Sequence, residues 1–206
     1  TRSRASLAAA LLGCSTLAVG APLPTRNENP LLAPFGVPGV LPARLPAAGG
    51  DAVGATFNWS NSMTLESEGN SAYHMDAEWQ ELRLEWLHGV TDRVAVRGEL
   101  PWRRLSGGTL DHAIEQWHEF WSLPNGDRDE VARDALRIEF SQGPDLLLQV
   151  DESGSGLGDI PLSIGWQLRA GERHALAAWF TVKAPTGRAR DLSGSGALDA
   201  AASVAG

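Results

Sequence analysis

The sequence predicts an all-β fold: an antiparallel up-and-down transmembrane β-barrel, incomplete here at about six strands, with a helix-containing long extracellular loop. Segments of about ten residues alternate apolar and polar side chains, tight turns alternate with long loops, and tryptophans stand near strand ends. Alternation with period two indicates strands with one apolar and one polar face, and strands of this length cross a hydrocarbon layer when tilted. A soluble amphipathic β-fold also alternates and stays the alternative.

Composition limits the function classes. The chain has 206 residues, a net charge of −8 and only 17 Lys and Arg, so it offers no basic patch for nucleic acid. A single Cys cannot form an internal disulfide, and the five His show no paired metal-ligand spacing. We therefore expect no nucleic-acid partner, no metal site and no cofactor.

Residues 1–21 have the pattern of a secretory signal peptide. Arg2 and Arg4 precede an apolar run that ends in small residues at 19–21. Two processing routes stay open: LLGC (11–14) fits a lipobox that would place a lipid on Cys14, whereas cleavage after Ala21 would discard it. We favour cleavage after Ala21, because the apolar run continues past the Cys. On either route the mature protein leaves the cytoplasm.

The next segment, residues 22–50, contains seven prolines, a density that forbids a helix or a central strand. We expect an extended periplasmic leader there. The barrel is then predicted over residues 51–206, with an excursion at 103–157.

The first three predicted strands set the orientation of the barrel. Alternating apolar residues start at Val53, and a polar loop at 65–76 leads to a hairpin of strands 78–87 and 93–102 with a tight turn at 88–92. Trp79 and Trp102 stand at the hairpin end away from the turn and are interpreted as part of an aromatic girdle. Short turns then fall on the periplasmic side and long loops outside.

Charged side chains occupy the other face of this hairpin. The five lumen-facing candidates are Glu81, Arg83, Glu85, Arg97 and Glu99. They could bias ion passage through an open channel or pair across strands and fill a narrow barrel. Because the signs nearly balance, we favour the pairing role.

The excursion at 103–157 is too long for a plain connection, so it is the candidate functional region. Helical spacing of apolar residues predicts an amphipathic helix at 109–122, and two apolar runs between 136 and 150 predict a small hairpin. The helix could narrow the pore, lie on the membrane interface or pack on the barrel rim. The constriction or lid candidates are Ile114, Trp117, His118, Phe120 and Trp121.

General acid/base chemistry is the less favoured interpretation of this helix. Asp111 beside His112 and His118 beside Glu119 could suggest a membrane-embedded hydrolase. No nucleophile elbow or Ser/His/Asp order accompanies them, so a solvated helix face is favoured. We expect a protein that is not an enzyme.

Strand periodicity resumes at 160–168 and 176–182, and another strand begins near 197. Six strands cannot close a spanning barrel, for which eight is the practical minimum. We expect further strands beyond this sequence.

Seven short motifs, taken in order, resemble one family. They are TRNENPL (25–31), ELPW (99–102), SGGTLD (106–111), EQWHEF (115–120), LPNG (123–126), GLGD (156–159) and KAPTG (183–187). This set is similar to the domain-of-unknown-function family DUF3187, and the similarity covers residues 22–206. The resemblance implies a secreted proteobacterial protein grouped with outer-membrane β-barrels, without an established activity.

The functional expectation is a channel or transporter for a small solute in the cell outer membrane. Its partners would be outer-membrane lipid, the barrel assembly machinery during biogenesis and the solute. A plugged structural or adhesive barrel, or a soluble β-rich lipoprotein anchored through Cys14, are the alternatives.

Overall fold

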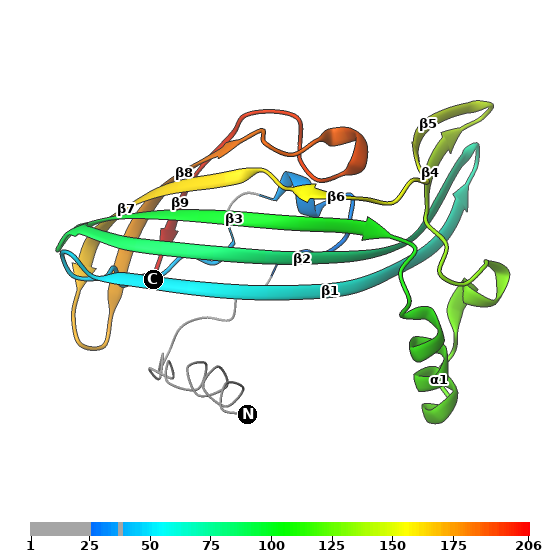
Figure 1. Ribbon diagram of the computed structural model, residues 1–206, viewed down its shortest axis with the longest axis horizontal. Coiled ribbons are helices and arrows are strands. Elements are labelled where there is room, and N and C mark those ends of the chain that lie inside the picture. Colours follow the sequence, from blue (N-terminus) through cyan, green and yellow to red (C-terminus); the bar gives the residue numbers. More distant parts are fainter. Residues whose placement is uncertain (1–25, 37–38) are drawn as a thin grey trace, which may run out of the picture.

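The computed structural model describes residues 26–36 and 39–206 (Figure 1). The expected signal peptide and Cys14 lie outside the described residues. The strands are β1 (Asp51–Glu68), β2 (Ser71–Thr91), β3 (Val94–Ser106), β4 (Arg137–Gln142), β5 (Asp145–Val150), β6 (Gly154–Leu157), β7 (Ile160–Ala170), β8 (Ala175–Ala184) and β9 (Asp199–Ala205). The helices are α1 (Asp111–Trp121) and three short 3₁₀ turns, η1 (Ala33–Phe35), η2 (Gly126–Glu130) and η3 (Ala189–Asp191).

Six strands form a curled half-barrel. Their order is β1-β2-β3-β7-β8-β9, and each neighbouring pair is antiparallel. Chain neighbours pair in every case except β3 and β7, between which the excursion is inserted. The predicted antiparallel up-and-down β architecture is confirmed.

The long strand β2 pairs with two different strands, β3 and β4, along one of its edges. β1 pairs along its other edge from Ser71 to His88, while β3 pairs with residues 78–91 and β4 with residues 71–76. β4 and β5 form a hairpin that extends the sheet beyond β3. We call the tip of the β1–β2 hairpin, residues 61–78, and the β4–β5 hairpin, residues 137–150, the outer hairpins. They share the continuous strand β2 with the half-barrel.

Two turns differ from the prediction. The loop expected at 65–76 is wrong, because β1 and β2 continue to Glu68 and Ser71 and leave only Gly69 and Asn70 as the turn. The segment is mostly polar, so the apolar pair Tyr73 and Met75 was too short a pattern to predict strands there, but hydrogen bonding between the two backbones does not need apolar alternation. At the other end the turn is at residues 92–93 and not at 88–92, because a register shift after Gly89 absorbs the extra residue.

The excursion has the expected helix and hairpin. α1 covers 111–121 where 109–122 was predicted, and β4 and β5 match the predicted hairpin. β3 itself continues to Ser106, and Gly154–Leu157 forms β6, which pairs with the end of β3. The structured insertion is thus shorter than 103–157.

The Pro-rich segment, residues 26–36 and 39–50, lies against the concave side of the sheet; we call it the inner segment. Leu41 and Leu45 form a buried cluster with Ala95, Ala177 and Trp179. Proline has no N–H to donate to a strand ladder, so this segment is not a strand of the sheet. One of its backbone carbonyl groups accepts from a side chain instead: Trp179 Nε1 donates to Pro42 O at 3.0 Å. The sequence predicted an extended leader but gave no signal for this packing.

A second buried cluster lies where β2, β3 and β4 meet. It contains Met75, Trp79, Leu105, Ile138 and Leu192. Trp79 is only 1% exposed, so its assignment to the aromatic girdle is wrong. Trp79 is two residues before Glu81 and four before Arg83 on β2, and alternate residues of a strand share a face. Its side chain therefore points to the concave side with theirs.

Candidate functional site

The half-barrel has an apolar outside and a charged inside. Exposed apolar side chains cover its convex face, and we call them the convex apolar band: Val53, Phe57, Trp59, Leu82, Leu84, Trp86, Leu100, Trp102, Leu162, Ile164, Trp166, Leu168 and Phe180. The buried residues of the concave face include Glu81, Arg83, Arg97, Glu99 and Lys183. This polarity is the reverse of that in a globular β-sandwich, in which the apolar faces meet inside.

Arg83 and Arg103 pair with the carboxylates of β2 and β3. Glu81 stands directly opposite Arg103 in the register, and Arg103 Nε donates to Glu81 Oε2 at 2.7 Å. Arg83 donates to Glu81 on its own strand and lies 3.3 Å from Glu99 Oε2. The guanidinium of Arg103 also lies 5.5 Å from the ring centroid of Trp79, in cation–π range.

Arg97 joins the other two carboxylates. Its Nη2 lies 3.0 Å from Glu85 Oε1, and its Nη1 donates to Glu99 Oε1 at 2.5 Å. All five lumen-facing candidates from the sequence are therefore brought together in one group of ion pairs. With Arg103 and Arg26 we call this group the concave ion network.

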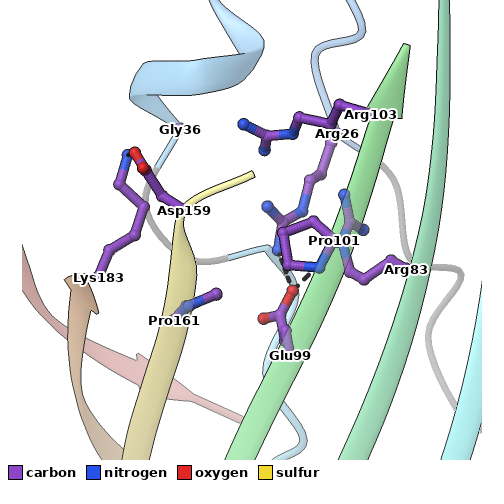
Figure 2. A pocket seen from close by; sticks show the side chains of 9 residues that line it. All are labelled: Arg26, Gly36, Arg83, Glu99, Pro101, Arg103, Asp159, Pro161 and Lys183. Carbon is purple, nitrogen blue, oxygen red and sulfur yellow. Dashed lines mark hydrogen bonds and ion pairs between the residues drawn. The ribbon is translucent and has the colours of Figure 1, made fainter. Parts of the chain in front are cut away.

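The inner segment completes the network from the opposite side. Arg26 Nη2 donates to Glu99 Oε2 at 2.7 Å, and Figure 2 shows Arg26 and Arg83 beside this carboxylate. Together with Arg97, three guanidinium groups contact Glu99. Nearby, Asn58 Nδ2 of β1 donates to Glu28 Oε1 at 2.9 Å. The segment is held by charge-assisted bonds that no strand pattern in the sequence indicated.

Lys183 of β8 is the centre of a second group. Its Nζ lies 2.8 Å from Asp199 Oδ2 and 3.3 Å from Asp159 Oδ2, and it also donates to Pro34 O of the inner segment. Asp159 in turn accepts from the backbone N–H groups of Gly187 and Ser195 at 3.0 and 2.7 Å. Lys183 alternates with outward apolar residues in the sequence, which was the available signal for its inward direction.

Little space remains between the inner segment and the wall. The cavity there measures ≈ 10 Å³, about one water molecule, and Figure 2 shows its lining. Four cationic side chains and two carboxylates line it, together with Gly36, Pro101 and Pro161: Arg26, Arg83, Arg103, Lys183, Glu99 and Asp159. With the inner segment in place, this region has no room for a solute.

The lid candidates lie elsewhere. Figure 1 shows α1 beyond the end of β3, running across the strand direction, and not over the concave face. Trp117, Phe120 and Trp121 are exposed, so they do not pack on the barrel rim, while Ile114 and His118 are partly buried. His118 Nδ1 lies 3.1 Å from Asn125 Oδ1.

The acid/base candidates of α1 have structural partners. Asp111 is buried, accepts from Arg128 Nη1 at 2.7 Å and from Asn61 Nδ2 at 3.0 Å, and also accepts from the Asp134 N–H. Among the described residues, no group of three or more His, Cys, Asp or Glu is placed to hold a metal ion. In residues 26–36 and 39–206, no helix has the length and apolarity needed to cross a membrane.

The fold defines a class: a predominantly antiparallel β protein with a half-barrel sheet that is apolar outside and ion-paired inside. The chain belongs to the family described as protein of unknown function (DUF3187), whose model matches residues 10–206. The resemblance drawn from the seven motifs is thereby confirmed. No curated protein and no solved structure matches the chain.

Proposed function

We propose that this protein is an outer-membrane β-barrel that passes a small solute and that its own inner segment closes the lumen. The observation that carries the proposal is the reversed polarity of the half-barrel. An apolar convex band is costly against water and favourable against lipid, whereas a charged concave face suits a lumen.

The spacing of the outward tryptophans supports a membrane span. Trp102 stands opposite Leu82, and Trp166 stands opposite Val94, which is opposite Thr91. The two levels are thus eight residues apart along β3 (94 to 102), which is about 27 Å along a strand and roughly 19–22 Å along the membrane normal at a tilt of 35–45°. An apolar band between aromatic girdles is about 25 Å tall in such barrels.

The inner segment is the closing element of this proposal. It contacts both ion groups of the wall, through Arg26 at Glu99 and through Pro34 O at Lys183. Gln167 of β7 donates to Ala43 O at 2.8 Å near the other end. The segment is held by these polar contacts and by the small apolar cluster around Leu41 and Leu45. Its withdrawal would leave a lumen lined by charged residues.

Export and insertion follow from the same proposal. A signal peptide at 1–21 would carry the chain across the inner membrane, and the barrel assembly machinery would insert it. The pairing of Asp111 in α1 with Arg128 in η2 supports a structural rather than a catalytic role for Asp111.

Planar-bilayer conductance of the full-length protein tests the proposal. We expect rare or no openings for the wild type, and stepwise conductance after deletion of residues 26–46 or replacement of Arg26 by Ala. Deletion of 109–121 is the matched control, because α1 lies away from the concave face and its loss should leave the conductance at the wild-type level. Silence from every variant, with folding shown by heat-modifiable mobility, would exclude the channel.

A sealed structural or adhesive barrel is the second candidate. The complete ion pairing around the ≈ 10 Å³ cavity favours it, because such a wall costs free energy to disassemble. Channel silence combined with cell-surface exposure of the outer hairpins would support this candidate. Mass spectrometry of the mature N-terminus tests the lipoprotein route, since lipidation would leave Cys14 as the first residue and signal cleavage would leave Pro22.

A further inference from the structure

Helix α1 is amphipathic, but its aromatic side chains are exposed and its carboxylates Asp111 and Glu115 bond to the rest of the protein. Asp111 bonds Asn61 and Arg128, and Glu115 accepts from Arg133 Nε at 2.7 Å, while Ile114 on the same side is partly buried. Its aromatic residues point away from these contacts, with Trp117 59%, Phe120 75% and Trp121 55% exposed. A helix of a globular protein usually turns its apolar stripe towards the core.

The aromatic residues form one compact surface. The rings of Trp117 and Trp121 meet edge to face with centroids 5.6 Å apart, and Phe120 and Trp121 do so at 4.9 Å. Leu123 adds a further exposed apolar side chain directly after the helix. We call these four residues the aromatic patch.

Buried carboxylates hold this patch in position. Glu78 Oε2 of β2 accepts from the backbone N–H groups of Thr109 and Leu110 at 2.9 and 3.0 Å, just before the helix. Asp111, the first helical residue, accepts from Arg128 and from the Asp134 N–H. These bonds fix the start of α1 to β2 and to the loop after the helix. The exposed aromatic side chains take no part in them.

The three sides of α1 match a helix at a lipid–water interface. With 3.6 residues per turn, the exposed polar residues His112 and Glu119 lie roughly 140° around the helix from the mean direction of Trp117, Phe120 and Trp121, whereas Gln116 lies at the border, about 40° from Phe120. The protein contacts occupy the side between them. An interfacial helix needs this arrangement, with aromatic residues towards the acyl boundary and polar residues towards water.

We propose that the aromatic patch anchors the outer rim of the protein in the headgroup layer of the surrounding membrane. This inference rests on the proposed membrane position of the half-barrel. Trp59 and Trp102, the outward tryptophans of β1 and β3, lie at the same end of the sheet as α1. β3 continues four residues past Trp102, about 13 Å along the strand and about 10 Å along the normal, which brings α1 to headgroup level.

The tryptophans of the aromatic patch favour contact with the membrane headgroup layer over contact with a protein partner. Of the eight tryptophans, Trp79 and Trp179 are buried inside, and four others are exposed on the convex face: Trp59, Trp86, Trp102 and Trp166. The remaining two are in the patch. Tryptophan is enriched at the membrane–water interface, because its ring is apolar and its N–H remains solvated.

Spin-label accessibility in phosphatidylcholine bilayers tests the anchor. In the full-length protein with Cys14→Ser, a nitroxide is attached at Trp117→Cys or Phe120→Cys and, as the matched control on the water side, at Glu119→Cys. We expect labels at 117 and 120 to be relaxed mainly by oxygen, and the label at 119 mainly by a water-soluble nickel chelate.

A label at Leu84→Cys in the convex apolar band separates this inference from the proposed function. Oxygen exposure at 84 with nickel exposure at 117 and 120 would overturn the anchor but leave the barrel. Protection of 117 and 120 from both reagents would also overturn it, since a protein partner would then cover the patch. Nickel exposure at 84 as well would exclude the membrane position itself.

Discussion

Glu85 and Glu99 stand directly opposite each other on β2 and β3, and Arg97 contacts both carboxylates. Like charges directly opposite on adjacent strands are destabilising unless a cation lies between them. Arg97 is two residues from Glu99 on the same face of β3, so its side chain reaches both. The pairing of these three residues is thus a condition for β2 and β3 to keep their register.

Replacing Arg97 by Ala should therefore destabilise the half-barrel strongly. Removing one partner of a buried ion pair costs about 3–5 kcal/mol, because the remaining charges stay buried. The expected result is a lower urea midpoint, measured by tryptophan fluorescence of the full-length protein in vesicles. The double variant Arg97→Ala, Glu85→Gln is the control and should recover part of the loss; equal stability of Arg97→Ala and wild type would contradict the assignment.

Gly165 should be intolerant of even a methyl group. A Cβ at this position would lie 2.8 Å from three ring atoms of Trp179, whose Nε1 donates to Pro42 O. Gly165→Ala would push the ring away and loosen the inner segment, at about 1–3 kcal/mol of overpacking. We expect faster proteolysis within residues 39–50.

The matched control for this variant is Gly98→Ala. There the new Cβ would lie 3.5 Å from Leu162 Cδ2, an ordinary contact on the convex side. Proteolysis of the inner segment should be unchanged in Gly98→Ala. If both variants are cleaved at the wild-type rate, the ring of Trp179 does not hold the segment.

The convex apolar band should reject charge. Leu162→Arg places a cation at the middle of the band, because Leu162 stands opposite Gly98, midway along β3 between Val94 and Trp102. A charged residue at the bilayer midplane costs about 2–4 kcal/mol. Urea titration of the protein in phosphatidylcholine vesicles should show this loss. Glu68→Arg, at the exposed tip of β1 beyond the band, is the control and should change the free energy of unfolding little. Similar small effects at both positions would argue against lipid contact.

Asp76 should make the outer hairpins sensitive to pH. It lies on β2 beyond the apolar band, is 1% exposed, and within the described part of the chain neither of its carboxylate oxygens has a hydrogen-bond partner. Burial, followed by the charge of Asp111, raises the pKa of Asp76 to about 6, opposed by Arg128 and assisted by Asp134. In the unfolded chain an Asp carboxyl titrates near 3.9.

The folded state therefore holds a proton that the unfolded chain releases between these two pKa values. The stabilising effect of this proton is fully present below about pH 4 and is lost as pH rises through about 6, on the order of 3 kcal/mol in total. We expect hydrogen exchange in β4, corrected for intrinsic rates, to be more protected at pH 4.5 than at pH 7.5. Asp76→Asn should remove the difference; a persistent difference in that variant would assign it to another group.

Much of the half-barrel could be predicted from alternation alone. The outward faces of β1, β7 and β8 and the inward side of Glu81 and Arg83 follow directly from period two, because an apolar band leaves little freedom of register. Beyond that band the signal weakens: residues 65–76 are mostly polar apart from Leu65, Tyr73 and Met75, and their strand pairing depends on the backbone ladder.

The contacts of the inner segment were also beyond sequence analysis. Arg26 reaches a carboxylate 73 residues away, and Lys183 reaches a backbone carbonyl 149 residues away. No sequence pattern relates the two residues of either pair to each other. The prolines of the inner segment indicate only that it is neither a helix nor a central strand. The five wall charges were identifiable from their parity, but the cations that complete their pairing, Arg26 and Arg103, were not.

The length of β2 has a mechanical consequence. One unbroken strand carries Asp76 among the outer hairpins and Glu81 in the concave ion network, five residues further along. Paired strands on both edges stiffen it, so a tilt imposed on the outer hairpins displaces the carboxylate wall against which Arg26 rests. In the proposed membrane position, a force applied to the loops outside the membrane is in this way transmitted along one continuous strand to the contact between Arg26 and Glu99.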